Sequence, residues 1–149
     1  MSASAGQTVV LSHGRAALVD TAYLVALLDP RDALNHRAVR LAKALAAAKA
    51  ALVCTDAVLT ELANYFCRSP LRSHAIAWID AIVSARGWEI VSVDRSLFLR
   101  GLGRYRRHLD KTWSLTDCTS MEVMQDRGLT DVATSDAGFS QGGFKVLLR

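Results

Sequence analysis

Four acidic side chains, far apart in the sequence, are the residues of this chain best suited to chemistry. They are Asp20, Glu61, Asp117 and Asp136. Each closes an apolar run or lies in the first turns of a segment with helical spacing. In an α/β protein such positions converge on one crevice, at the carboxyl ends of parallel strands. Carboxylates packed together raise one another's pKa and destabilise the fold, so a bound cation is the natural compensation.

The residue types indicate which cation and which chemistry. Oxygen ligands without cysteine or histidine favour Mg²⁺ or Mn²⁺ over zinc. The three cysteines contain no CxxC pair, and the four histidines show no zinc-ligand spacing. A hard cation activates a water and neutralises charge on a phosphoryl oxygen. Since no Ser–His or Cys–His pair and no glycine-rich phosphate loop is evident, the sequence predicts metal-assisted hydrolysis of a phosphodiester.

Each acid also has a purely structural interpretation. Asp20, Asp56 and Asp136 stand where a helix could begin, and so could serve as N-caps. Asp117 follows Ser114 by three residues, the spacing of a capping box. The glutamate could be an exposed helix residue. Taken singly, each structural interpretation is the stronger one; only the convergence of four acids favours a metal site.

The elements that must position these acids alternate between strands and helices. Strands are predicted at 16–20, 51–55, 88–93, 129–136 and 144–148 from short apolar runs. Helices are predicted at 21–29, 32–50, 57–68, 71–86, 94–108 and 114–128 from apolar spacing, caps and stop signals. This alternation indicates an α/β sandwich with a mainly parallel sheet.

Length and composition limit the remaining possibilities. The 149 residues fit one domain over 16–149, preceded by a flexible tail over 1–15. No apolar run reaches the roughly 18 residues of a membrane span, and the start lacks the pattern of a signal peptide, so a cytoplasmic protein is expected. The net charge of +4 suits an anionic partner. Six basic residues are concentrated in one stretch, which is equally typical of a solvated helix face: Arg95, Arg100, Arg104, Arg106, Arg107 and Lys111.

Three segments resemble the motifs of PIN domains, in particular those of VapC-type toxins. They are LVDTAYLVALLDPRDALNH (18–36), TDAVLTELANYF (55–66) and DKTWSLTDCTSMEVMQDRGLTDVATSDAGF (110–139). The resemblance implies a three-layer PIN-like fold, with a five-stranded parallel sheet of order 3-2-1-4-5 and helices on both faces. The family's acids carry over onto the four acids named above.

The resemblance also implies a function. The chain is expected to be a Mg²⁺- or Mn²⁺-dependent endoribonuclease, the toxin of a type II toxin–antitoxin pair, with RNA as substrate, a cognate antitoxin as partner and a homodimer as its assembly. Asp20 and Asp117 are the expected direct metal ligands, and the other two acids would act through waters or a second ion. Thr134 matches a hydroxyl that orients a carboxylate or water, and Thr21 matches one with an equally plausible backbone role. The expected products carry a 5′-phosphate and a 3′-hydroxyl.

Two other functions fit the sequence less well. A phospho-acceptor receiver domain requires an acidic pair at the end of the first strand, but Val19 precedes Asp20 here, and Lys145 falls inside the last strand. A catalytically silent PIN-like module that only binds RNA or protein is the second alternative, and the intact acid set speaks against it. Trp113 could stack on a base, although packing is the stronger interpretation. Leu24, Val25 and Leu28 are candidates for a partner surface or for the core.

Overall fold

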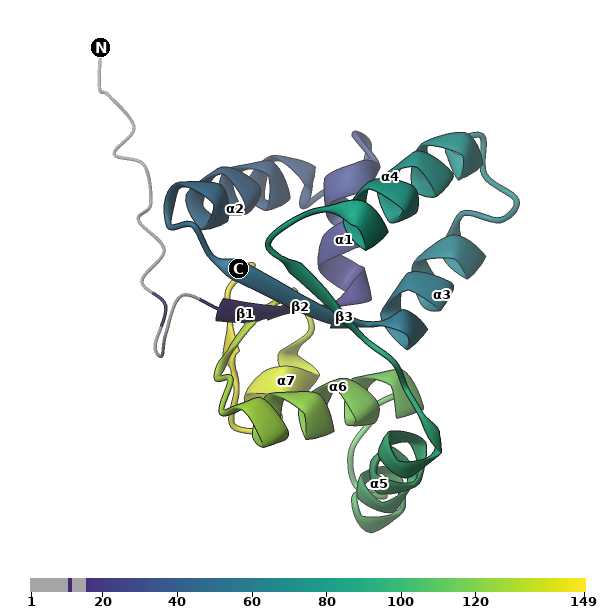
Figure 1. The fold of residues 1–149 in the computed structure, drawn as a ribbon, viewed down its shortest axis with the longest axis vertical. Helices are drawn as coiled ribbons and strands as arrows, with labels where there is room; N and C mark the ends of the chain where they lie inside the picture. The colour runs from purple at the N-terminus through teal and green to yellow at the C-terminus, as the bar shows by residue number, and fades with distance from the viewer. Residues whose placement is uncertain (1–10, 12–15) are drawn as a thin grey trace.

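The computed structural model describes residue 11 and residues 16–149. Five strands form one parallel sheet in the order β3-β2-β1-β4-β5 (Figure 1). In chain order they are β1 (Ala16–Val19), β2 (Ala51–Thr55), β3 (Trp88–Val91), β4 (Asp131–Ala133) and β5 (Lys145–Val146). The sheet confirms the predicted fold class and strand order. The tail predicted over 1–15 lies outside the described residues, apart from residue 11.

Seven helices cover the two faces of this sheet in the described part of the chain. They are α1 (Thr21–Leu28), α2 (Asn35–Ala47), α3 (Asp56–Tyr65), α4 (Arg72–Ser84), α5 (Arg95–Arg107), α6 (Leu115–Arg127) and α7 (Ala137–Gln141). Figure 1 shows α1 to α4 on one side of the sheet and α5 to α7 on the other. Of the helices described, none combines the length and the apolar character needed to cross a bilayer.

Alternating side chains of the central strands build two separate cores. Ala17 and Val19 of β1 pack into the core beneath α1 to α4, whereas Leu18 packs into the core beneath α5 to α7. β4 divides in the same way, with Ala133 on the first side and Val132 on the second. Because both faces of this parallel sheet are covered, its central strand β1 is apolar throughout rather than alternating with polar residues.

Several strands and helices have other boundaries in the structure than those predicted from the sequence. The strand predicted over 129–136 is β4, with only three residues, and the one predicted over 144–148 is β5, with two. Helix α7 follows β4 directly and has five residues, too few to produce a helical pattern of apolar residues. The prediction of a turn after the fourth strand was therefore incomplete. Helix α6 agrees with its prediction, beginning after Ser114 and ending before Gly128.

Asp56 is not the N-cap of α3. Thr55 holds that position in an extended conformation, and its hydroxyl accepts a hydrogen bond from the backbone N–H of Val58 at 3.2 Å. The Asp56 carboxylate instead accepts the N–H of Val93 at 2.9 Å, which ties the start of α3 to the segment after β3. The predicted cap was one residue too late because Thr and Asp are both good N-caps and stand side by side.

The apolar residues of α1 and α4 differ in how deeply they are buried. Leu24, Val25 and Leu28 of α1 are buried in the core, so they form no free partner surface in this chain. In α4, Ile82 is buried, while Ile76 and Val83 are 53% and 62% exposed. The core therefore covers only part of the apolar residues of α4.

Candidate metal and RNA site

One cavity holds all four predicted acids. It has a volume of about 450 Å³, and residues of α1, α3, α6 and the β4–α7 connection line it. Asp20, Glu61, Asp117 and Asp136 come from these four places, so segments far apart in the sequence meet at the edge where the parallel strands end. The structure thus brings together every acid that the sequence singled out.

Asp20 is the most deeply buried acid of the cavity, 3% exposed. It directly follows β1, and its backbone N–H donates to the carbonyl of Ala133, which continues the pairing of β1 with β4. The hydroxyl of Thr134 donates to Asp20 Oδ2 at 2.8 Å. The side chain does not cap α1, so the structural interpretation of this acid fails.

The pKa of Asp20 is raised to about 7. Burial is the largest cause, and the nearby charge of Asp117 is the second, with Glu61 adding a smaller contribution in the same direction. The hydrogen bond from Thr134 opposes this shift because it favours the ionised form. A buried carboxylate next to other carboxylates is costly to ionise unless a cation joins them.

Asp117 caps α6 and also lines the acid cavity. It forms a capping box with Ser114: its carboxylate accepts the Ser114 N–H at 2.9 Å, and its own N–H donates to the Ser114 hydroxyl at 3.0 Å. Only one carboxylate oxygen takes part, and the residue also lines the cavity. Its pKa is raised chiefly by burial, with Asp136 and Glu61 contributing.

Glu61 and Asp136 are the other two acids of the cavity. Glu61 lies in the second turn of α3 and is half-buried. Asp136 caps α7, accepting the N–H of Gly138 at 2.7 Å, while its own N–H donates to the Thr134 hydroxyl at 3.1 Å. Thr134 therefore connects Asp20 and Asp136 through a single oxygen, a link that the sequence could indicate only by resemblance.

Four further residues of the cavity were missed or undervalued by sequence reasoning. Asp32, Tyr65 and Ser135 line it, and none carried a signal, because each lies in a connection or on an exposed helix face. Thr21 also lines it, and its buried hydroxyl has no hydrogen-bond partner among the residues that the structure describes. A buried polar atom is normally paired, so this hydroxyl is an unusual feature of the cavity wall.

The donor set fits a hard divalent cation. Carboxylate and hydroxyl oxygens are the ligands of Mg²⁺ and Mn²⁺, and neither cysteine nor histidine lines the cavity. Within residues 16–149, no three acidic, cysteine or histidine side chains already stand in a ready-made coordination cluster. Mg²⁺ commonly takes one or two carboxylates and keeps several waters. The acids of the cavity could therefore hold such an ion through one or two carboxylates and several waters.

Trp113 is a packing residue and lies outside this cavity. It is 6% exposed, and its indole N–H donates to the carbonyl of Gly138 at 2.9 Å. A Cβ on Gly138 would lie 3.0 Å from both the Trp113 ring and Asp136 Oδ1, so only glycine fits between them. The indole packs against the start of α7. Because the indole is buried, it cannot stack on a base within the acid cavity.

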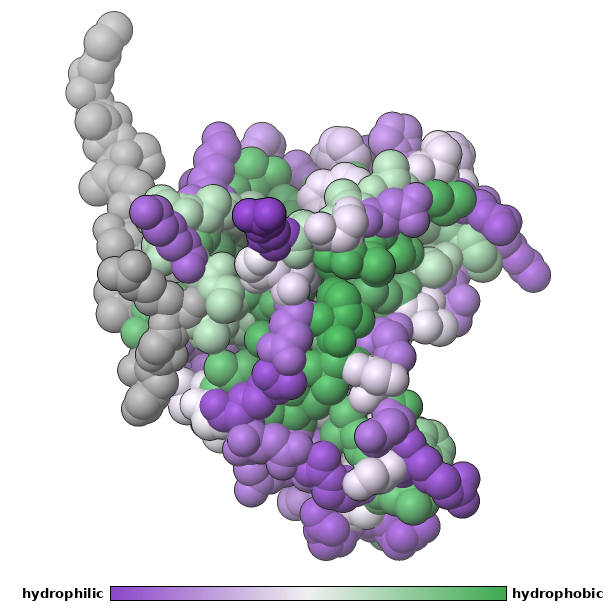
Figure 2. All heavy atoms as spheres, viewed as in Figure 1, coloured by the Kyte–Doolittle hydropathy of each residue, from purple (hydrophilic) through white to green (hydrophobic). Residues whose placement is uncertain are grey.

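The basic stretch divides into paired and unpaired cations. Arg104 contacts the buried Glu122 at 2.8 Å, and Arg100 binds Asp126 at 2.8 Å, so these two join α5 to α6. Arg95, Arg106 and Arg107 are exposed and have no acidic partner among the described residues. Hydrophilic side chains gather over this part of the molecule in Figure 2, below the sheet.

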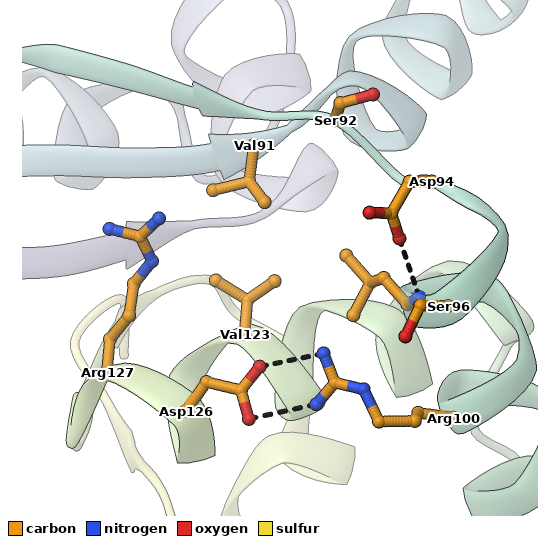
Figure 3. Close-up of a pocket in the computed structure, with 9 residues that line it drawn as sticks. Val91, Ser92, Asp94, Ser96, Arg100, Val123, Asp126 and Arg127 are labelled. Carbon is orange, nitrogen blue, oxygen red and sulfur yellow. Dashed lines mark hydrogen bonds and ion pairs between the residues drawn. The ribbon is translucent and has the colours of Figure 1, made fainter.

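A second cavity, of about 310 Å³, lies between the end of β3 and helices α5 and α6 (Figure 3). Arg100 faces Asp126 across it, and the hydroxyl of Ser96 and the carboxylate of Asp94 stand at the start of α5. Arg127, on its other side, contacts Glu89. Its cations are matched by acids and it contains none of the four predicted acids, so it is not the predicted site.

Known proteins share this fold and its sequence pattern. A family model described as the PIN domain matches residues 17–145. The structure is similar to that of VapC20 from Mycobacterium tuberculosis, described as a toxin that cleaves the sarcin–ricin loop, with 27% identity and a TM-score of 0.76 over 85% of this chain and 95% of that one. FitAcB from Neisseria gonorrhoeae shares the fold at 18% identity, with a TM-score of 0.59 over 87% of this chain and 94% of that one. A search of curated protein sequences gave no significant match.

Proposed function

The chain belongs to the PIN-domain family, and from this premise we propose that it is a metal-dependent endoribonuclease, the toxin of a type II toxin–antitoxin pair. Residues 16–149 would form its one catalytic domain, acting in the cytoplasm. The observation that carries the proposal is the meeting of Asp20, Glu61, Asp117 and Asp136 in one cavity.

The chemistry follows from the cavity's own groups. A hard divalent cation bound there supplies a nucleophilic water at neutral pH and neutralises charge that develops on a phosphoryl oxygen. Asp20 and Asp117 are the proposed direct ligands, because both are buried and both line the cavity. Glu61 and Asp136 would hold waters, or a second ion, at the open side.

Hydroxyl groups prepare these carboxylates for the cation. The bond from Thr134 fixes the orientation of Asp20 and favours its ionised form. The Ser114 N–H does the same for one oxygen of Asp117. Thr21 would contribute to the same wall of the cavity, next to Asp20. Such supporting contacts typically change metal affinity or activity by about 10- to 100-fold.

RNA is the proposed substrate, and exposed arginines of α5 would contact its phosphates. Phosphate contacts position a nucleic acid without reading its sequence, so they leave the target open. Since VapC20 is described as cleaving the sarcin–ricin loop, an RNA stem-loop of that sequence is the first structured substrate to test. A cognate antitoxin and a homodimer are further parts of the proposal, which rest on the resemblance to VapC-type toxins.

The proposal is tested by cleavage of total RNA, with end sequencing to map the cut sites. We expect cleavage in Mg²⁺ or Mn²⁺ that stops with chelator and with Asp20→Asn, leaving 5′-phosphate ends. Asp80→Asn, an exposed acid of α4 outside the cavity, is the matched control and should cut like the parent. If Asp20→Asn cut at the parental rate with metal present, the proposed site would be wrong.

The same assay separates the proposal from a catalytically silent PIN-like regulator. Such a module would bind RNA or a partner protein but would give no metal-dependent ends at any enzyme concentration. The intact acid set and its supporting hydroxyls favour the nuclease, because a raised pKa such as that of Asp20 is typical of catalytic sites.

A further inference from the structure

A small cavity beside the acid site has the composition of a nucleotide-binding subsite. It has a volume of about 240 Å³ and is lined by Tyr105, His108, Leu109, Lys111, Thr112 and Trp113. We propose that this cavity holds one unpaired RNA nucleotide next to the scissile phosphate, with its base against Tyr105 and His108 and its phosphate near Lys111. The inference rests on the proposed ribonuclease function and names a specificity site for it.

The size and the aromatic lining suit a single base. Pockets for drug-sized ligands measure about 300–1,000 Å³, so a smaller cavity suits one planar ring system. Tyr105 is 48% exposed, so much of its side chain is open to a ligand. The centroid of the His108 ring lies 4.9 Å from that of Trp113, with the rings tilted by 53°, and this contact with the buried indole orients the imidazole. Unpaired RNA bases are typically recognised by stacking on such side chains.

The cavity is physically joined to the acid site. Trp113 lines the small cavity, while the next residue, Ser114, lines the acid cavity and caps α6. The Trp113 indole donates to the carbonyl of Gly138, whose N–H donates to Asp136. Trp113 and Gly138 therefore connect the lining of the small cavity with Asp136 of the acid cavity.

The charge around the cavity favours an anion over an apolar ligand. Arg106 and Arg107, in the last turn of α5, are exposed and without acidic partners in the described part of the chain. Lys111 contacts only its neighbour Asp110, at 3.0 Å on the surface, and such exposed pairs contribute little and exchange readily. A polynucleotide combines the negative charge and the planar rings that this lining matches.

An abasic scan tests the subsite without depending on cleavage. A labelled hexaribonucleotide and its six single-abasic derivatives are bound, at fixed salt, to protein carrying Asp20→Asn, and the Kd is measured by fluorescence anisotropy. We expect one abasic position to weaken binding by about fivefold or more, the range of one base–aromatic stack. Adding Tyr105→Ala should weaken binding of the intact RNA by a similar factor and remove the effect of that abasic position.

Matched variants identify which side-chain group causes the loss of RNA affinity. Tyr105→Phe keeps the ring and should restore binding, while Leu99→Ala removes an exposed apolar side chain of the same helix outside the cavity and should leave every Kd unchanged. Lys111→Met should weaken all seven RNAs equally and lower the salt dependence by about one phosphate contact. Melting curves of each variant verify that the fold is kept.

Two results would overturn the subsite: Tyr105→Ala binding the intact RNA as tightly as its parent, or losing affinity while every abasic effect persists. A failure of the nuclease proposal appears separately, as wild-type protein that gives no metal-dependent ends. The two failures are therefore distinguishable, because the anisotropy experiment measures binding in a background that needs no catalysis.

Discussion

At the scale of single residues, the burial of Asp20 determines how stability depends on pH. Its pKa is about 7 in the folded, metal-free protein, against an ordinary 3.8. The folded state therefore keeps a proton that the unfolded state has lost between roughly pH 4 and 7, so stability falls as the pH rises through that window.

Asp20→Asn should remove this loss of folding stability at higher pH. In chelator at pH 8 we expect the variant to be more stable than the wild type by at most about 4 kcal/mol, and the difference should shrink towards zero near pH 4. Urea denaturation at the two pH values measures it. A larger advantage in acid than at pH 8 would contradict the assigned direction, and Asp80→Asn should show no such pH-dependent gain.

Thr134 carries a second prediction at this scale. Thr134→Val keeps the shape but removes the donor to Asp20, which should raise the pKa of Asp20 further and lower metal affinity by about 10- to 100-fold. Thr134→Ser should largely restore it. Titration with Mn²⁺ at pH 7 and pH 9 gives the readout: the defect should be smaller at pH 9, where the proton competes less. An equal defect at both pH values would assign Thr134 a purely steric role.

The acids were predictable because they stand at the ends of apolar strands and at helix starts, which sequence periodicity marks. Asp32, Tyr65 and Thr21 were not found as cavity residues by the same reasoning. Asp32 lies in a connection, where its carboxylate accepts the N–H of Leu34, and no pattern tells where a connection folds. The missing partner of the Thr21 hydroxyl is a property of packing, invisible in the chain alone.

At the scale of elements, α5 depends on a close approach to α6. A Cβ on Gly101 would lie 2.5 Å from the Thr119 methyl and 3.2 Å from its backbone nitrogen. Ion pairs of Arg104 with Glu122 and of Arg100 with Asp126 lock the same contact. The inner face of α5 therefore packs tightly against α6, while the unpaired arginines of α5 are exposed to solvent.

Gly101→Ala should destabilise the protein by about 1–3 kcal/mol, the typical cost of overpacking. Gly103→Ala is the matched control: its new Cβ would meet only the flexible end of Arg107, so we expect a gain of up to about 1 kcal/mol from helix propensity. Chemical denaturation measures both. Combining Gly101→Ala with Thr119→Ser should recover part of the loss, and a Gly101→Ala protein as stable as Gly103→Ala would disprove the close contact.

Sequence patterns indicated the long elements well and the short ones poorly. Helix α6 was predicted to within a residue at each end because a capping box and a terminal glycine mark it. β4, α7 and β5 are each five residues or fewer, so tertiary pairing rather than local pattern determines their limits. The exposure of Ile76 and Val83 on α4 had no local signal either, because it depends on where the sheet ends.

At the scale of the whole molecule, the acid cavity is a junction of four separate segments. In the sheet order β3-β2-β1-β4-β5, consecutive numbering breaks between β1 and β4. Asp20 follows one of these strands and Asp136 closely follows the other. Such a break opens a crevice at the carboxyl ends of the strands, which is why acids 116 residues apart in the chain (136 minus 20) meet there.

Metal binding should therefore stabilise the entire fold. Mn²⁺ at about 100 times its Kd should add about 2.7 kcal/mol to the free energy of unfolding, or roughly 5–10 °C in melting temperature for a chain of this size. Asp20→Asn should lose most of this shift, whereas Tyr105→Ala should keep it. A wild-type melting temperature that does not respond to Mn²⁺ would contradict binding at this junction.

One residue, Gly138, contacts both neighbouring sites. Its N–H donates to Asp136, and its carbonyl accepts the indole N–H of Trp113. Exchanging the connection that carries Trp113 for one from another family member, in order to redirect specificity, would consequently shift the carboxylate as well. If the proposed ribonuclease function holds, a change of RNA target would require transplanting the start of α7 together with that connection, because otherwise target choice and cation binding would change in one step.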